Sequence, residues 1–198
     1  MHGSEALNFH VAEEWVQLTK ESELLQSATT ILSGDKPLSA DPHHEVIILM
    51  GTASAIEKCY SGMERILKIL AENMDDYVPK GDTWHKSLIN QMASDIESRP
   101  AVISSGTAQG LHVLRAFRHR ERNSYSMDLD KGRVIELGEE AFSVMDALKS
   151  DLTSRLGMRL PESPEKNIVD SSLAIPFNQD GHFDMEELPH ADTKKNRL

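Results

Sequence analysis

The sequence has little of three things: cysteine, aromatic residues and long apolar runs. Its one cysteine, Cys59, has no partner for a disulfide within the chain, and its apolar neighbours Ile56 and Met63 predict a buried thiol. Aromatic residues make up 5% of the chain, too few for a typical β-sandwich core, so helices are favoured. No apolar run approaches the roughly 20 residues that cross a bilayer, and the first residues lack the features of a secretory signal. We therefore expect a cytoplasmic protein without a membrane partner.

Basic residues are also scarce, because 21 lysines and arginines stand against 32 acidic residues and the net charge is −11. Such a charge excludes nonspecific binding of nucleic acid through the general surface. The exception is the segment from Leu114 to Tyr125, where four arginines and one glutamate give a local charge of +3. Any contact with an anion is expected there.

Helical spacing would place the polar groups of this segment on one side. One stripe carries Arg115, Arg118, Arg122 and Tyr125, and a neighbouring stripe carries His112, His119 and Asn123. Guanidinium groups fit phosphate, imidazoles hold or move protons near neutral pH, and a phenol or an amide can orient either. This set can bind or cleave a phosphodiester. The alternative is a solvated helix face whose arginines make weak ion pairs.

The hydrophobic pattern predicts an all-α fold, an up-and-down bundle of about five helices. Apolar residues at helical spacing, separated by turn residues, place the helices at about 6–33, 42–74, 83–92, 105–122 and 131–156. Asp82 is placed to cap the third helix. The apolar run Val46–Met50 predicts that the first half of the second helix is its most buried part.

The chain is expected to fold as one helical domain, residues 1–156, followed by a tail. Beyond residue 156 the helical pattern is lost, and prolines and an acidic stretch predict that residues 157–198 are extended or disordered. A role of this tail in docking a partner is the alternative.

Three stretches of the bundle resemble the HepT-like branch of the HEPN (higher eukaryote and prokaryote nucleotide-binding) proteins. They are Cys59-Tyr-Ser-Gly-Met-Glu-Arg65, Pro79-Lys-Gly-Asp-Thr-Trp-His-Lys-Ser-Leu-Ile-Asn-Gln-Met92 with the following Arg99-Pro-Ala-Val-Ile103, and Phe117-Arg-His-Arg-Glu-Arg-Asn-Ser-Tyr125 with Leu129-Asp130. Their order and spacing agree with that family over about residues 45–155. The resemblance implies a helical bundle that forms a homodimer, in which two arginine-containing motifs face one cleft.

The resemblance also implies an activity, metal-independent endoribonuclease cleavage by the toxin of a toxin–antitoxin pair. In this family an arginine, followed at short spacing by a histidine, activates the ribose 2′-hydroxyl and stabilises the phosphorane. A tyrosine often follows the histidine, and an antitoxin nucleotidyltransferase of the MntA type can adenylylate it. The implied partners are RNA and such an antitoxin, with no cofactor and no metal.

On this chain the motif's arginine is Arg118, Asn123 stands at the histidine position, and Tyr125 is the following tyrosine. Asparagine cannot accept a proton as an imidazole can. The nearby substitute is His119, one turn before Asn123. In the first interpretation Arg118 and Arg122 clamp the scissile phosphate. His119 moves the proton, and Asn123 holds the substrate by hydrogen bonds. The neighbouring arginines that would bind substrate are Arg115 and Arg122.

Two other interpretations stay open. The same groups can bind RNA or a nucleotide without cutting it, or the bundle can be a protein-interaction scaffold. A metal site is not indicated, because the adjacent His43 and His44 diverge on a helix. Trp84 and His85 are interpreted as packing residues, with His85 bonded to a backbone carbonyl.

Overall fold

The computed structural model describes residues 2–34, 41, 43–121 and 129–161, without the side chains of residues 2–4 and 119–121. The predicted tail beyond Pro161 lies outside these residues. The helices are α1 (His2–Leu32), α2 (His43–Met74), α3 (Trp84–Met92), α4 (Ser105–Glu121) and α5 (Lys131–Leu156). The all-α prediction is confirmed, since the described part of the chain contains no strand beyond one isolated bridge. None of its helices is long and apolar enough to cross a membrane.

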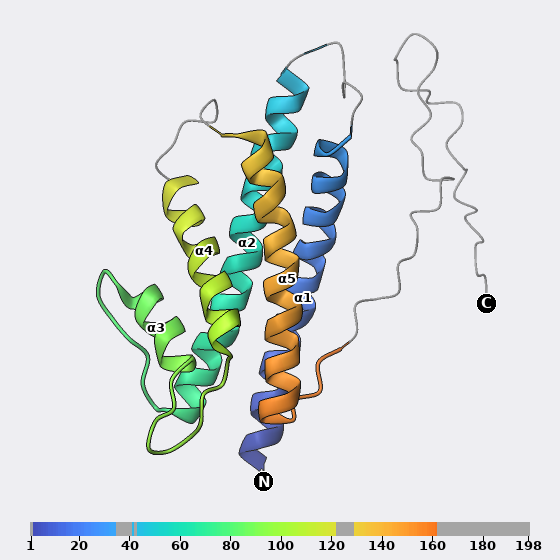
Figure 1. Cartoon of the computed structure of the whole chain (residues 1–198). Helices are drawn as coiled ribbons and strands as arrows, with labels where there is room; N and C mark the ends of the chain where they lie inside the picture. The colour runs from blue at the N-terminus through green and yellow to red at the C-terminus, as the bar shows by residue number, and fades with distance from the viewer. Residues whose placement is uncertain (1, 35–40, 42, 122–128, 162–198) are drawn as a thin grey trace, which may run out of the picture. The chain divides into compact units, whose positions relative to one another are not determined.

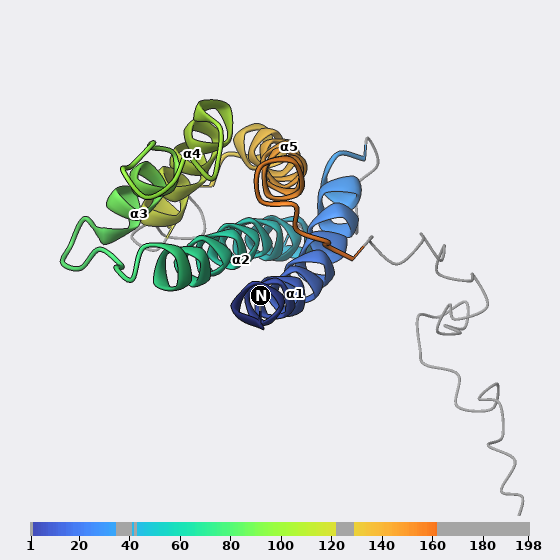
Figure 2. The same ribbon diagram turned by 90° about the horizontal axis from the view of Figure 1, so that it is seen from below.

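Helix α2 is the central element of the bundle. It contacts each of the other four helices, whereas α1 contacts α2 and α5. Helices α3 and α4 pack on the side of α2 that faces away from α1 (Figures 1 and 2). One side of α2 therefore meets α3 and α4 together, and side chains from these three helices can converge there.

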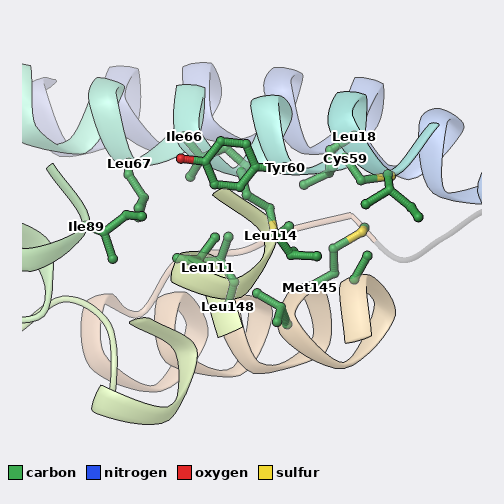
Figure 3. Packing of buried hydrophobic residues seen from close by; sticks show 14 of the residues in the cluster. Leu18, Cys59, Tyr60, Ile66, Leu67, Ile89, Leu111, Leu114, Met145 and Leu148 are labelled. Atoms are coloured by element: carbon green, nitrogen blue, oxygen red, sulfur yellow. The ribbon is translucent and has the colours of Figure 1, made fainter. Parts of the chain in front are cut away.

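The apolar stripes predicted from the sequence form one continuous core. Figure 3 shows Tyr60 and Leu67 of α2 close to Leu111 and Leu114 of α4, and all four side chains are fully buried. The predicted burial of Cys59 is also confirmed. Burial, followed by the nearby charge of Glu21, raises the pKa of the Cys59 thiol to about 12. The thiol is therefore protonated and inert at neutral pH.

Two local predictions are wrong. The first half of α2 is its most exposed apolar part, because Ile47 is 60% and Met50 46% exposed. The first turns of α2 extend beyond the described end of α4, so that helix does not cover them (Figure 1). Asp82 does not cap α3 either: the N-cap residue is Thr83, and Trp84 N donates to Gly81 O at 3.2 Å.

The start of α4 is anchored to α5 by Asp151. One carboxylate oxygen, Oδ2, accepts hydrogen bonds from Ser104 N at 2.8 Å and from Thr107 Oγ1 at 2.6 Å. Ser104 Oγ in turn accepts from Thr107 N at 3.1 Å, which satisfies a free amide of the first turn. Burial alone would raise the pKa of Asp151, but these hydrogen bonds and one from Arg155 lower it. The axial position of α4 is thereby fixed.

Gly110 lets α4 approach α5 closely. A Cβ atom on Gly110 would collide with Cγ2 of Val144 and lie 3.2 Å from Glu140 Oε1. Because Val144 is β-branched and stiff, we expect Gly110→Ala to lower the free energy of unfolding by about 1–3 kcal/mol, despite a helix-propensity gain of about 1 kcal/mol.

The matched control for this prediction is Gly51→Ala in α2. Nothing lies within 4 Å of a Cβ at Gly51, so the substitution should raise stability by up to about 1 kcal/mol. Urea unfolding of both variants and the wild type measures these changes in the free energy of unfolding. A Gly110→Ala protein as stable as the wild type would contradict the close packing of α4 on α5.

A buried ion pair holds the loop after α3 against the end of α2. Arg99 Nε donates to Asp75 Oδ1 and Nη2 to Oδ2, each at 2.6 Å, and the two side chains are 6% and 5% exposed. Gln91 Nε2 also donates to Asp75 Oδ2 at 2.6 Å. The same guanidinium group donates to the backbone oxygens of Ser94, Pro100 and Gln91. This fully bonded arginine fixes α3 against α2.

Candidate functional site

Arg118, the motif arginine, extends from α4 to α2 and lies between two carboxylates. Its Nε donates to Glu57 Oε1 at 3.1 Å, and its Nη1 lies 3.8 Å from Glu64 Oε2. Its Cζ atom is 5.9 Å from the centre of the Tyr60 ring, near the limit of a cation–π contact. The Arg118 side chain is 19% exposed, so it is held by these contacts and is still partly open to solvent.

A histidine from α3 completes the cluster. His85 Nδ1 lies 2.5 Å from Glu64 Oε1, and Tyr60 Oη donates to the same oxygen at 2.6 Å. Burial, then the charge of Glu64 and the hydrogen bond to it, raises the pKa of Tyr60, so the phenol stays protonated. Glu64 is therefore held by two donors, one from its own helix and one from α3.

The His85 ring is also held on its sides. Trp84 stacks on it with the ring centres 3.8 Å apart and the planes 29° apart. Arg118 Nη1 lies 3.5 Å from Nδ1 and 3.4 Å from Nε2. Because these distances are nearly equal, the guanidinium nitrogen lies beside the ring and not in line with either ring nitrogen. The cluster of Glu57, Tyr60, Glu64, His85 and Arg118 is called the Arg118 site below.

Further basic groups lie beside the Arg118 site on α3 and α4. Arg115 is partly exposed one turn before Arg118, and Lys86 follows His85. Burial, followed by the charges of Arg115 and Lys86, lowers the pKa of His112. His112 is thus neutral at neutral pH, and its Nε2 donates to Asn90 Oδ1 at 2.9 Å. The positive charge on this face is carried by the arginines and the lysine.

The arrangement brings together the groups that phosphoryl chemistry requires. A guanidinium can bind and stabilise a charged phosphate, and an imidazole can accept a proton. Glu64 is the most buried of the charged groups, 8% exposed, whereas the side chain of His85 is 26% exposed. The carboxylate of Glu64 is therefore shielded, whereas the side chains of His85, Glu57 and Arg118 are partly exposed to a ligand.

The predicted site residues fall into two groups. Arg115 and Arg118 lie on α4 and share its partly exposed face, as the spacing predicts. The backbone of His119 belongs to α4, but its side chain is outside the described residues. The positions of Arg122, Asn123 and Tyr125 lie outside them as well, so their predicted roles stay predictions.

Sequence reasoning missed Glu64 and assigned His85 the wrong partner. Trp84 packs against the core as expected, but His85 bonds a buried carboxylate and not a backbone carbonyl. One signal was present: Glu64 falls on the apolar stripe of α2 between Tyr60 and Leu67. A charged residue on a buried helix face requires a partner, and His85 and Arg118 are its partners here.

No group of three or more His, Cys, Asp and Glu side chains suited to a metal ion occurs in the part of the chain that the structure describes. Neither the curated proteins nor the solved structures contain a match to this chain. The sequence model of one family, described as HepT-like protein, matches residues 51–156, more than half of the chain. That match runs from the first half of α2 to the end of α5 and contains the whole Arg118 site. The chain belongs to the HepT-like protein family.

Proposed function

We propose that this protein is a metal-independent endoribonuclease of the toxin type, which cleaves an RNA phosphodiester at the Arg118 site. The observation that carries the proposal is the position of Arg118. Its guanidinium group lies beside an oriented imidazole, and it belongs to the segment in which this acidic chain is densest in arginine. Membership in the HepT-like family supports it, since the resemblance described above places the arginine of that family's motif at Arg118.

In this proposal Arg118 stabilises the charge that develops on the phosphate during cleavage. A guanidinium presents a fixed fork of donors, and its contacts with Glu57 and Tyr60 hold that fork in place before substrate arrives. Arg115 and Arg122 add positive charge for the flanking phosphates. Asn123 holds the substrate by hydrogen bonds from its amide.

Such an enzyme would act with three binding partners in the cytoplasm. RNA is the substrate, and a second copy of the chain supplies the other half of a composite cleft in a cytoplasmic homodimer. An antitoxin nucleotidyltransferase modifies Tyr125. An adenylyl group there would bring a negative phosphodiester next to the arginine stripe, fill the anion site and block substrate.

The test is incubation of the purified full-length chain with mixed RNA in excess EDTA, followed by analysis of the product ends. We expect fragments with 2′,3′-cyclic phosphate and 5′-hydroxyl ends, since the ribose 2′-hydroxyl is the attacking group. A matched oligonucleotide with a single ribonucleotide in a deoxy background should be cut only after that ribose. Cleavage that requires added metal would contradict the mechanism.

A second candidate is a binding module that holds RNA or a nucleotide without cutting it. Asn123 at the family's histidine position favours this candidate, because an amide cannot move the proton. It predicts RNA binding that weakens steeply with salt and yields no product in any buffer. The same incubation distinguishes the endoribonuclease from the binding module when both RNA binding and cleavage products are measured.

A further inference from the structure

We propose that His85, oriented by Glu64, is the group that accepts the proton from the attacking hydroxyl at the Arg118 site, in place of His119. This inference rests on the proposed RNA cleavage. It assigns the acid–base step to α3, a helix that does not carry the arginine motif.

The hydrogen bond to Glu64 sets the proton on the imidazole of His85. An ionised carboxylate can only accept, so Nδ1, at 2.5 Å from Glu64 Oε1, is the protonated nitrogen. In the neutral ring Nε2 then carries the lone pair. The donor Tyr60 Oη on the same oxygen keeps the carboxylate from turning. His85 is therefore in the tautomer that a general base requires at Nε2.

The contact that Nε2 makes with Arg118 Nη1 is long, 3.4 Å, so a substrate hydroxyl can replace it. Trp84 covers a ring face, and Arg118 Nη1 lies beside the ring at nearly equal distances from both nitrogens. A donor bonded in line with the Nε2 lone pair would lie much farther from Nδ1. With a quarter of the side chain exposed, a ligand that binds Arg118 also reaches His85.

The reaction balances with these groups and one water molecule. His85 Nε2 takes the proton of the ribose 2′-hydroxyl, and O2′ forms a bond to phosphorus while the bond from phosphorus to O5′ breaks. The leaving O5′ takes a proton from water, and the hydroxide so formed removes the proton from the imidazolium. The products are a 2′,3′-cyclic phosphate and a 5′-hydroxyl. Glu64 stabilises the transient imidazolium, and Arg118 stabilises the phosphorane.

The identity of residue 123 makes such an assignment necessary. Asn123 cannot accept a proton, so cleavage requires another base near Arg118. Among the described side chains, His85 is the imidazole in contact with that guanidinium, whereas His112 bonds Asn90. Glu64 touches no substrate in this account and acts as a positioning residue.

The experiment measures RNA cleavage in EDTA by full-length wild type, His85→Ala and the matched control His10→Ala, whose side chain is exposed on α1. His85→Ala should lower kcat by about 100-fold or more with little change in KM. Added imidazole should restore the lost rate in proportion to its neutral form, because it can enter the space left by the side chain. His10→Ala should match the wild type at every pH.

Two further variants keep the test decisive. His85→Gln retains a side chain that can bond Glu64, so it covers the case in which His85→Ala unfolds, and it should be as slow but insensitive to imidazole. Glu64→Gln should lower kcat without changing KM and should move the acidic limb of the pH–rate profile.

Each outcome has one meaning. A folded His85→Ala protein with wild-type kcat, or one whose loss imidazole does not restore, overturns the assignment, most directly if His119→Ala is inactive instead. A wild-type protein that cuts no RNA overturns the proposed function itself, and the assignment of His85 with it.

Discussion

Replacement of Arg118 by alanine is expected to lower the rate of RNA cleavage by about 100- to 1,000-fold, the usual effect of removing one donor that stabilises a developing anion. The guanidinium group is held by Glu57 and lies beside His85, so its loss removes both the charge on the phosphate and the neighbour of the proposed base. Cleavage of a defined RNA under single-turnover conditions in EDTA measures the effect.

Two controls define what Arg118 contributes. Arg118→Lys keeps the charge but loses the planar fork, so its rate should lie between those of the wild type and Arg118→Ala. Arg133→Ala removes an exposed arginine of α5 whose contact is Glu136, one helical turn away, and should leave cleavage unchanged. Arg118→Ala cleaving RNA at the wild-type rate would exclude the Arg118 site as the place of the reaction.

Replacement of Arg99 by alanine is expected to cost about 3–5 kcal/mol of stability, the usual penalty for leaving a buried charge without its partner. The Arg99–Asp75 pair is nearly fully buried, and Arg99 also binds three backbone oxygens. As a control, Arg65→Ala breaks a pair with Glu14 in which Arg65 is 56% exposed, and should cost at most about 1 kcal/mol. Urea unfolding near pH 7 compares the two.

The loss of stability in Arg99→Ala should depend on pH. Burial alone would raise the pKa of Asp75, but the hydrogen bonds from Arg99 and Gln91 and the charge of Arg99 lower it below its ordinary value. The stabilisation by the Arg99–Asp75 pair is thus complete above the pKa of an aspartate in the unfolded chain, about 4. It is lost as the pH falls through the lower pKa that Asp75 has in the folded protein. The difference in the free energy of unfolding between wild type and Arg99→Ala should therefore become smaller in that acidic range. A difference in unfolding free energy that stays constant in this range would contradict the ion pair between Arg99 and Asp75.

The helices could be predicted because their signals are local. Apolar residues at helical spacing fix which face of a helix is buried, and turn residues fix where it ends. The exposure of α2 around Ile47 could not be predicted from local spacing, since it depends on how far α4 extends along α2. Asp82 failed as a cap for a similar reason: a single-residue preference cannot distinguish it from the adjacent Thr83.

The Arg118 site could be predicted only in part. Arg118 was found because the arginines are dense within one segment. His85 and Glu64 are 21 residues apart, and His85 and Arg118 are 33 residues apart, on different helices. Such a contact depends on the crossing of α2, α3 and α4, which no local pattern encodes. The charged residue on the buried stripe of α2 indicated that a partner exists, but not which one.

The most direct test of RNA cleavage at the Arg118 site measures binding and cleavage of one RNA by wild type and Arg118→Ala in EDTA, in parallel. The wild type is expected to cut the RNA to a 2′,3′-cyclic phosphate end, whereas Arg118→Ala should still bind the RNA, less tightly, and yield almost no product. Binding of the RNA by both proteins without cleavage by either, in the absence of the proposed antitoxin and of any modification at Tyr125, would contradict cleavage at the Arg118 site.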